Sequence, residues 1–234
     1  MRVSIHQPNY IPWIGYFEKI FLSDTFVFFD NVQMPMNKSL VSRNKILFQS
    51  KPMWLTIPTE KGGIKPIKEV KISDTKWKKK HLNTLYHAYG KKKYFNDIFK
   101  NIQPIIEKKN IYLVDLNMDL IKVFLKILNV NEVKIIRASE LNLQTKGANS
   151  IFEILKKLEA KTYITGTGAG STKYINAEDY NKININLMYN QPNIQNYYPK
   201  DKTVNQVLSI LDLLFNYGAE QVNKKLSEAS TLSL

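Results

Sequence analysis

A chain of 234 residues that is 44% hydrophobic is long enough for one large α/β domain or two small ones, which excludes an intrinsically disordered protein. The absence of cysteine excludes disulfides, thiolate metal sites and a cysteine nucleophile, and it fits a reducing compartment. No apolar stretch approaches the roughly 18 residues of a membrane span, and the first apolar run is too short for a signal peptide. We therefore expect a cytoplasmic protein without a membrane span.

The charge is strongly basic, with 34 Lys and Arg against 20 Asp and Glu and a formal net charge of +14. The excess gathers at residues 76–80 and 91–93. Such a field attracts nucleic acid, a membrane surface or a phosphorylated small substrate. Lys, Asn and Ile are all abundant, as AT-rich coding would produce. Part of the excess positive charge therefore reflects composition and lies on solvated helix faces. We therefore expect no nucleic-acid partner, with tRNA acting as a donor as the one exception.

The N-terminal 30 residues predict a strand, a helix and a second strand, at residues 3–5, 12–22 and 25–30. Two apolar strands separated by a helix favour a parallel sheet that is covered on both faces. A right-handed crossover brings the ends of both strands to the same edge. His6 and Asp30, which close the two strands, are therefore expected to face one crevice.

The middle of the chain predicts an insertion. Residues 31–75 are irregular, with a strand at 54–57 and a Gly62-Gly63 turn, and suggest an inserted hairpin or lid. Residues 76–130 predict a helical subdomain. Its expected helices cover residues 77–89, 94–108 with a break near Pro104, and 115–128.

The α/β pattern resumes at residue 131 and continues to residue 226. It predicts strands at residues 133–137, 162–165 and 183–188, and helices at 149–158 and 204–217, the last stopped by Gly218. We expect this half to complete the sheet begun in residues 1–75. The fold class is then α/β, a Rossmann-like, mostly parallel sheet with helices on both faces, an inserted helical subdomain and a frayed tail at 227–234.

Polar residues follow the first strand directly. Ligands in open α/β sheets bind at the carboxyl ends of strands, which places His6, Gln7 and Asn9 in a binding crevice with Tyr10 beside them. His6 can be a phosphate contact, an acid–base group, or a histidine that caps or fills the core. Gln7 and Asn9 can only hydrogen-bond, so we assign them to ligand positioning.

A second group of polar residues follows the second strand. Asp30 can hold Mg²⁺, orient an amine, or cap the following turn. Gln33, Arg43 and Asn44 suggest a wall of the site. Arg43 can grip a phosphate or carboxylate with two hydrogen bonds, although an exposed salt bridge is as common.

A glycine cluster follows the strand at 162–165. Backbone amides near Gly166, Gly168 and Gly170 can cradle an anion, such as a cofactor phosphate. The segment is neither a Walker loop nor a GxGxxG turn that opens a helix. A turn that requires positive φ is the alternative interpretation.

One helix carries an aromatic stripe, because Trp77, His81, Leu85 and Tyr89 recur at intervals of four. Aromatic side chains at helical spacing usually pack inward, and Trp77 otherwise stacks on a ligand. A buried His81 needs a partner from the protein or the substrate. The three histidines, at 6, 81 and 87, show no metal-ligand spacing, so no structural metal is expected.

The run HQPNYIPWIGYFEKI, which starts at His6, resembles the signature of the WbqC-like proteins. Further segments follow in that family's order: residues 30–33, 43–46, 54–56, Trp77 with Lys80-His81, 163–166 and 209–218. The resemblance covers nearly the whole chain, while residues 166–170 depart from the family's pattern. It implies a role in bacterial surface-polysaccharide and O-antigen lipopolysaccharide biosynthesis, where the family is suspected of joining an amino acid such as glycine to an amino sugar.

The layout is also similar, at the level of the fold, to class I adenylyltransferases such as pantothenate synthetase. Those enzymes have an HxGH-type motif, and here Tyr16 stands in place of its second histidine at a longer spacing from His6. The likeness supports the fold more than the reaction. An enzyme similar to pantothenate synthetase activates a carboxylate as an acyl adenylate, which an amine then attacks to form an amide.

The leading hypothesis is an aminoacyl or N-acyl transferase that acts on a nucleotide-linked amino sugar, with ATP and Mg²⁺ activating the amino acid. His6 and the glycine segment would then stabilise phosphate charge, Asp30 or His81 would take the amine proton, and Arg43 would hold a carboxylate or diphosphate. One alternative is a transferase that uses aminoacyl-tRNA or an acyl thioester. Another is a binding module for a sugar nucleotide or nucleic acid. Nothing in the sequence fixes the sugar, the acyl group or the oligomeric state.

Overall fold

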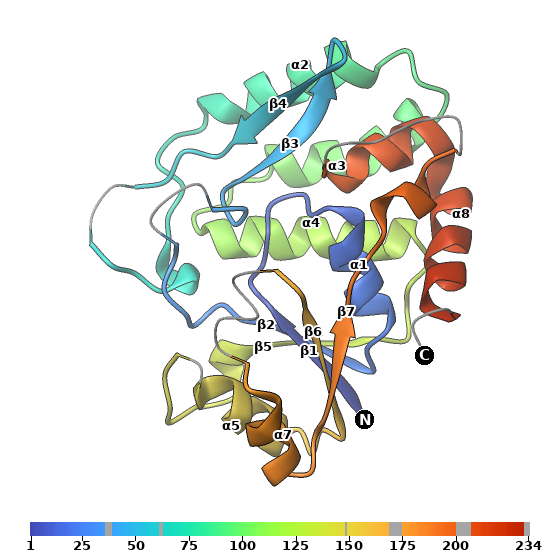
Figure 1. The fold of residues 1–234 in the computed structure, drawn as a ribbon. Coiled ribbons are helices and arrows are strands. Elements are labelled where there is room, and N and C mark those ends of the chain that lie inside the picture. The colour runs from blue at the N-terminus through green and yellow to red at the C-terminus, as the bar shows by residue number, and fades with distance from the viewer. Residues whose placement is uncertain (36–38, 61–62, 148, 169–174, 200–206, 232–234) are drawn as a thin grey trace.

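The computed structural model describes residues 1–35, 39–60, 63–147, 149–168, 175–199 and 207–231. Within these residues the chain forms a five-stranded parallel sheet with strand order β5-β2-β1-β6-β7, a separate hairpin of β3 and β4, and helices around both (Figure 1). The predicted Rossmann-like α/β class is confirmed.

The sheet consists of β1 (Arg2–His6), β2 (Thr25–Phe28), β5 (Lys134–Arg137), β6 (Thr162–Gly166) and β7 (Asn186–Asn190). From β1 the chain moves outward through β2 to β5, then returns to the other side of β1 for β6 and β7. The strand order therefore reverses between β1 and β6. Ligands of open α/β sheets bind in the crevice at such a switch point.

The two neighbours of β1 pair with it over different lengths. The ladder between β1 and β2 runs from Val3↔Thr25 to His6↔Phe28. The ladder between β1 and β6 stops at Ser4↔Ile164. Beyond Ser4, β1 is therefore paired with β2 alone, and we call the point where its pairing with β6 ends the opening of the sheet.

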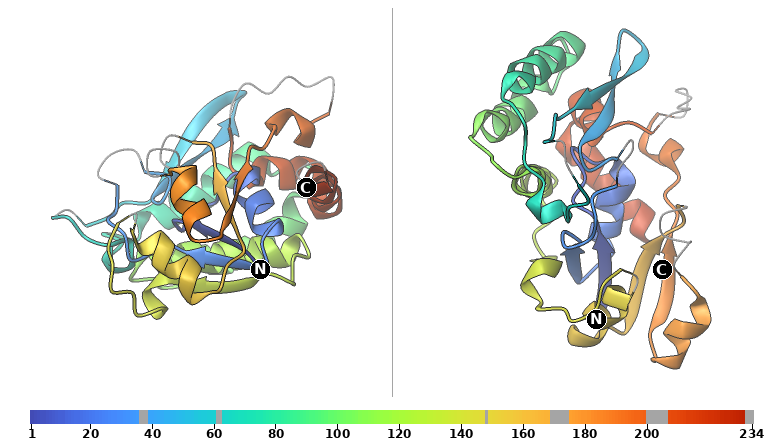
Figure 2. Two further views of the ribbon diagram at one scale, coloured as in Figure 1. Left: turned by 60° about the horizontal axis from the view of Figure 1, so that its bottom comes forward. Right: turned by 90° about the vertical axis from the view of Figure 1, so that its left-hand side faces the viewer.

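Successive side chains of β1 point to opposite faces of the sheet. Val3 and Ile5 pack with residues of α5 (Asn149–Lys157) and α7 (Ala177–Lys182). Ser4 and His6 lie on the opposite face, against α1 (Ile14–Phe21). The helices therefore cover both faces of the sheet, as predicted (Figure 2).

The predicted helices of the middle segment are α2 (Lys76–Tyr89), α3 (Phe95–Glu107) and α4 (Leu113–Ile127). They share one continuous hydrophobic core with α1 and with one face of the sheet. Helix α3 continues through Pro104, where a break is predicted. Pro104 lies in the last turn, and the buried stripe that includes Ile102 and Ile106 holds that turn against the core.

The inserted segment contains a hairpin of β3 (Arg43–Phe48) and β4 (Lys51–Thr56), paired from Arg43↔Thr56 to Phe48↔Lys51. Gln49 and Ser50 both have positive φ, which matches the twist of a two-residue hairpin turn. The sequence indicates β4 but not β3, because β3 begins with three polar residues, Arg43 to Lys45, and one of its two buried positions is the polar Asn44.

The C-terminal helix α8 (Ile210–Thr231) begins and ends later than expected. Residues 204–206 of the predicted helix lie outside the described residues. Gly218 interrupts the helical geometry with φ 79°, and a Cβ there would come within 2.8 Å of the Tyr94 ring. The helix nevertheless resumes after Gly218, because Val222 and Leu226 are buried, so the segment expected to fray is helical through Thr231.

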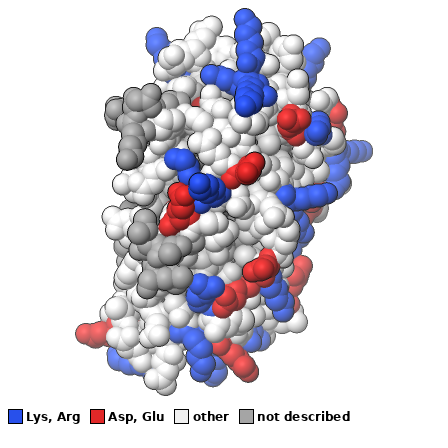
Figure 3. Space-filling model, turned by 90° about the vertical axis from the view of Figure 1, so that its right-hand side faces the viewer, with Lys and Arg blue, Asp and Glu red and all other residues white. Residues whose placement is uncertain are grey.

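Short 3-10 turns complete the described structure: η1 (Ile67–Glu69), η2 (Ala138–Glu140) and η3 (Ile194–Tyr197). No helix among the described residues combines the length and apolar composition needed to cross a bilayer. On the face seen in Figure 3, basic and acidic side chains are interspersed and do not form one basic patch. The excess charge is therefore spread out on this face.

Candidate active site

The loop between β1 and α1 is fixed by two buried asparagines. Nδ2 of Asn44 donates to the carbonyls of Tyr10, at 3.2 Å, and Ile11, at 2.8 Å. Nδ2 of Asn117 donates to the carbonyl of Pro8 at 2.8 Å. Ile11 is buried and has φ 42°, a conformation that is strained for a β-branched residue. Surrounding structure must enforce such strain, and strain of this kind clusters at functional sites.

Asn44, predicted to be in the substrate wall, lies beneath this loop. It is 5% exposed, its amide hydrogens bind the loop, and its Oδ1 accepts from the backbone N–H of Lys45 at 2.8 Å. The structure thus uses Asn44 to shape the loop. Asn117, which sequence reasoning missed, has the same role from α4, and a lone polar residue on the buried face of an apolar helix is the signal that marks it.

His6 lies at the carboxyl end of β1, half-buried, with its ring edge-on to Tyr16 at 4.8 Å between centroids. Its Nδ1 lies 3.0 Å from the carbonyl oxygen of Gln7. A carbonyl can only accept, so Nδ1 carries the proton in this contact and Nε2 presents a lone pair. Burial and then the charge of Lys19 lower the pKa of His6 to about 3, so the ring is neutral near pH 7.

Two charged residues interrupt the apolar sequence of α1, and both are buried. Glu18 accepts from Nδ2 of Asn190 at 2.6 Å and from the hydroxyl of Tyr197. Lys19 donates from Nζ to the carbonyl of Ile5 at 3.2 Å, and burial lowers its pKa to about 7. Sequence reasoning assigned neither residue a role, although a Glu-Lys pair inside an apolar helix was the available signal.

The loop between β1 and α1, which we call the signature loop, has further polar residues that differ in whether their side chains are hydrogen-bonded. Asn9 is 3% exposed, and its side-chain amide has no hydrogen-bond partner among the described residues. Gln7 is half-buried. Tyr10 is buried, and its hydroxyl lies 2.9 Å from Nδ1 of His81. Asn9 and Gln7 therefore have amide groups available to a ligand, whereas Tyr10 is used within the core.

Asp30 is completely buried at the end of β2, and both of its oxygens are occupied. Oδ2 accepts from Nε of Arg137 at 2.8 Å and from the hydroxyl of Ser139 at 2.7 Å. Oδ1 accepts from the backbone N–H of Ser139 at 2.9 Å. Asp30 thus ties the end of β2 to the end of β5. This contact pattern is that of an anchor, and a role as proton acceptor or Mg²⁺ ligand stays a prediction.

His81 is 2% exposed and has protein partners on its ring. The backbone carbonyl of Thr56 bonds to the ring, and since a carbonyl only accepts, the Tyr10 hydroxyl donates to Nδ1. Burial lowers the pKa of His81 to about 4, so it is neutral near pH 7. No hydrogen bond or ring contact among the described residues joins His81 to His6, and the catalytic role of His81 also stays a prediction.

The remaining predicted residues are dispersed. Trp77 is 4% exposed and packs against His81, with ring centroids 5.1 Å apart. Arg43 lies on the outer face of the hairpin, with its guanidinium carbon 4.1 Å from the centroid of the Trp54 ring. Gln33 is exposed and forms an isolated bridge with Pro66.

The predicted glycine segment begins at the switch point. Gly166 ends β6 and pairs with Asn190 of β7, beyond the point where β6 pairs with β1. A Cβ at Gly168 would meet open space, and its φ is not positive. Gly170 lies outside the described residues. The cofactor role of all three glycines stays a prediction.

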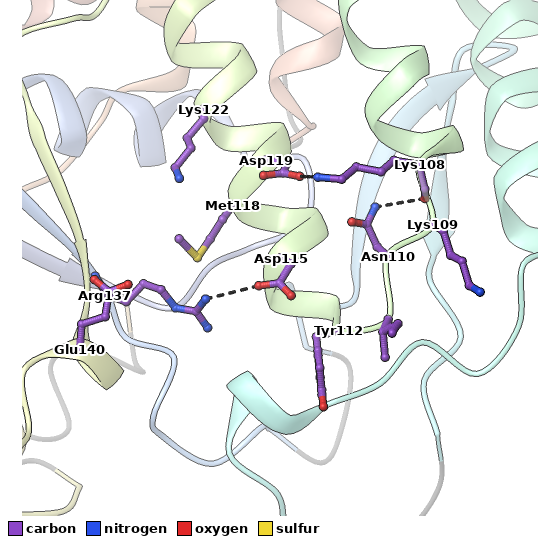
Figure 4. A pocket seen from close by; sticks show the side chains of 11 residues that line it. Lys108, Lys109, Asn110, Tyr112, Asp115, Met118, Asp119, Lys122, Arg137 and Glu140 are labelled. Carbon is purple, nitrogen blue, oxygen red and sulfur yellow. Dashed lines mark hydrogen bonds and ion pairs between the residues drawn. The ribbon is translucent and has the colours of Figure 1, made fainter.

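A cavity of about 590 Å³ lies elsewhere, between α4, the chain after α3 and the end of β5 (Figure 4). Four of its charged side chains form two ion pairs: Arg137 lies 3.3 Å from Asp115, and Lys108 lies 2.8 Å from Asp119. The cavity lies on the Arg137 side of the sheet and does not include the signature loop. Among the described residues, no group of three or more His, Asp or Glu is placed to hold a metal ion.

A model of the WbqC-like protein family matches residues 7–224. The chain belongs to this family. It is also 28% identical, over 223 residues, to "Uncharacterized protein Rv1507c" of Mycobacterium tuberculosis, and the match covers 94% of this chain and 95% of that protein. No solved structure matches it. The family match confirms the resemblance: its range begins at Gln7, directly after β1 of this WbqC-like protein, includes α1, and ends within α8.

Proposed function

We propose that this WbqC-like protein is an N-acyl or aminoacyl transferase that forms an amide on a nucleotide-linked amino sugar. The setting would be bacterial surface-polysaccharide or O-antigen biosynthesis, with an amino acid such as glycine activated by ATP. Family membership supports the setting. The parallel sheet supports a nucleotide-sized ligand at the switch point.

One observation carries the proposal: a neutral imidazole with an unprotonated nitrogen lies at the end of β1, directly before a strained loop at the switch point that buried asparagines hold in place. Amide formation joins an amine nitrogen to an acyl carbon, expels the activating group, and releases a proton from nitrogen. Nε2 of His6 is a suitable acceptor for that proton. Asn9 and Gln7 would position the donor through their free amide groups.

The low pKa of His6 sets a condition on this role. A group with a pKa of about 3 is a weak base, and catalytic bases work best near the ambient pH. A bound phosphate would favour the protonated imidazole and so raise the pKa of His6. His6 would therefore gain basicity when the phosphate-bearing substrate is bound.

ATP and Mg²⁺ would be substrates in this scheme, with Gly166 and Gly168 near the phosphates. Mg²⁺ is commonly bound by substrate phosphates together with one or two carboxylates. Asp30 is already held by Arg137 and Ser139, so we assign the metal chiefly to the phosphates.

A second donor class is favoured by the exposed lysines at both ends of α2. Lys79, Lys80 and Lys91 are all exposed there. They would provide a landing surface for aminoacyl-tRNA, and binding would then weaken steeply with added salt. An acyl thioester is the other donor of this class.

The test is to incubate the purified protein with UDP-linked or dTDP-linked amino sugars and glycine, with and without ATP, and to measure the masses of the products by mass spectrometry. An amide product that requires ATP supports adenylation, and a product formed only from charged tRNA or a thioester supports the second donor class. No product with any donor would overturn the proposal in favour of a binding module.

The role of His6 needs matched variants. We expect His6→Ala to lower turnover at least tenfold while the melting temperature stays nearly unchanged. His87→Ala, at an exposed histidine on α2, serves as the control and should retain activity. Loss of the fold in His6→Ala would assign His6 to the core.

A further inference from the structure

Lys19 is a buried cation without an acidic partner. It is 3% exposed, and the carbonyl of Ile5 is the one hydrogen-bond acceptor of its ammonium among the described residues. An ammonium has three N–H donors, so two are left unused. The oxygens of the neighbouring Glu18 accept from Asn190 and Tyr197, and no ion pair between Glu18 and Lys19 is found among the described residues. A buried charge in this state is costly and calls for an explanation.

The ladder geometry places this ammonium in the opening of the sheet. The carbonyl of His6 accepts from the N–H of Phe29 and therefore faces the β2 side of β1. Successive carbonyls along a strand point to opposite neighbours, so the carbonyl of Ile5 faces β6. The ladder with β6 has already ended at Ser4, and the ammonium of Lys19 takes the place of the missing strand partner.

The same ammonium lies near the proposed catalytic group. Its charge is one of the causes that lower the pKa of His6. In its neutral form, with Nδ1 bonded to Gln7, His6 can accept a hydrogen bond from a ligand but has no proton to offer a phosphate. The switch point therefore needs another donor for an anion, and Lys19 has two free N–H groups.

We propose that the ammonium of Lys19 binds a phosphate oxygen of the substrate at the opening between β1 and β6. This inference rests on the proposed function, since it uses the same crevice. The phosphate can come from the diphosphate of a nucleotide-linked sugar or from ATP and the adenylate formed from it. In either case Lys19 is a binding residue that offsets phosphate charge beside His6.

The test is calorimetric titration of the full-length protein with inorganic pyrophosphate, UDP and ATP. Lys19→Met, which keeps the length of the side chain without its charge, should weaken binding at least tenfold. Lys122→Met, at an exposed lysine beside the cavity of Figure 4, removes the same charge and should change the affinity less than twofold. If UDP binding depends on Lys19 and ATP binding does not, the phosphate bound by Lys19 comes from the nucleotide sugar. If only ATP binding depends on Lys19, the phosphate comes from ATP.

Thermal melting separates binding from a structural role. Without ligand, Lys19→Met should melt at or above the wild-type temperature, because an unpaired buried charge is removed, and its ligand-induced shift should be lost. Unaltered binding by Lys19→Met, or no binding of any probe by the wild type, overturns the inference. If Lys19-dependent binding is found but no amide forms with any donor, the proposed function fails alone. If Lys19→Met forms amide normally, the inference fails alone.

Discussion

The ends of β1 and β2 lie side by side on one edge of the sheet, yet their polar groups differ in hydrogen bonding. At the end of β2, Asp30 is fully bonded to Arg137 and Ser139. At the end of β1, Asn9 and Lys19 are buried with unused hydrogen-bonding groups. Buried polar groups are nearly always satisfied in folded proteins. The contrast therefore makes Asp30 an anchor between β2 and β5, whereas Asn9 and Lys19 keep hydrogen-bonding groups for the proposed ligand.

The largest effect is expected at Asp30. Asp30→Ala should lower the free energy of unfolding by about 3–5 kcal/mol, because it removes the acceptor of Arg137 and of both the N–H and the hydroxyl of Ser139. Urea unfolding measures this loss. Asp115, whose side chain is 47% exposed, also pairs with Arg137, and Asp115→Asn should cost less than about 1 kcal/mol. A stable but inactive Asp30→Ala would instead place Asp30 in the chemistry.

The next largest effect concerns the support of the signature loop. Asn117→Ala removes the donor to the carbonyls of Pro8 and Val41, and leaving buried groups unpaired costs about 1–3 kcal/mol each. We expect the free energy of unfolding to fall by about 2–3 kcal/mol and activity to fall with it, because the strained loop loses its restraint. Chemical denaturation and a turnover assay give the two values. Normal stability would show that the loop holds its own shape.

Lys19 should make stability depend on pH. Its pKa is lowered to about 7 in the folded protein from 10.5, so above pH 7 the unfolded chain binds more protons than the folded one. The free energy of unfolding should therefore rise between pH 7 and pH 9.5, and Lys19 adds at most about 1.4 kcal/mol per pH unit to this rise. Urea midpoints across this range should show the slope in the wild type. The same slope in Lys19→Met would assign it to another group.

The smallest effect on stability is expected at Asn9. Asn9→Ala breaks no hydrogen bond among the described residues, so the free energy of unfolding should change by less than about 0.5 kcal/mol. If Asn9 positions the donor, KM for that donor should rise while the fold stays intact. Set beside Asn117→Ala, this variant compares a bonded buried asparagine with an unbonded one. A large loss of stability would move Asn9 to the scaffold.

Local patterns were enough to predict much of the fold. The apolar runs at β1 and β2 with a helix between them indicate a parallel, covered sheet, and that architecture is confirmed. Element ends were predicted less well, as at α8, where the burial of Val222 and Leu226 extends the helix beyond Gly218. Strand β3 was missed because its pairing with β4, and not its composition, makes it a strand.

The sequence by itself determined the fold class, the family, and the position of the signature loop at the end of the first strand. Only the tertiary structure decided which polar side chains are already bonded, because the partners are distant in sequence. Asp30 meets Arg137 across 107 positions, and Asn117 meets Pro8 across 109. Periodicity reports which side of a helix or strand is buried, whereas satisfaction of a buried hydrogen-bonding group depends on long-range contacts. Those contacts bond both oxygens of Asp30 to residues at the end of β5, and they give the ammonium of Lys19 a single acceptor, the carbonyl of Ile5, among the described residues.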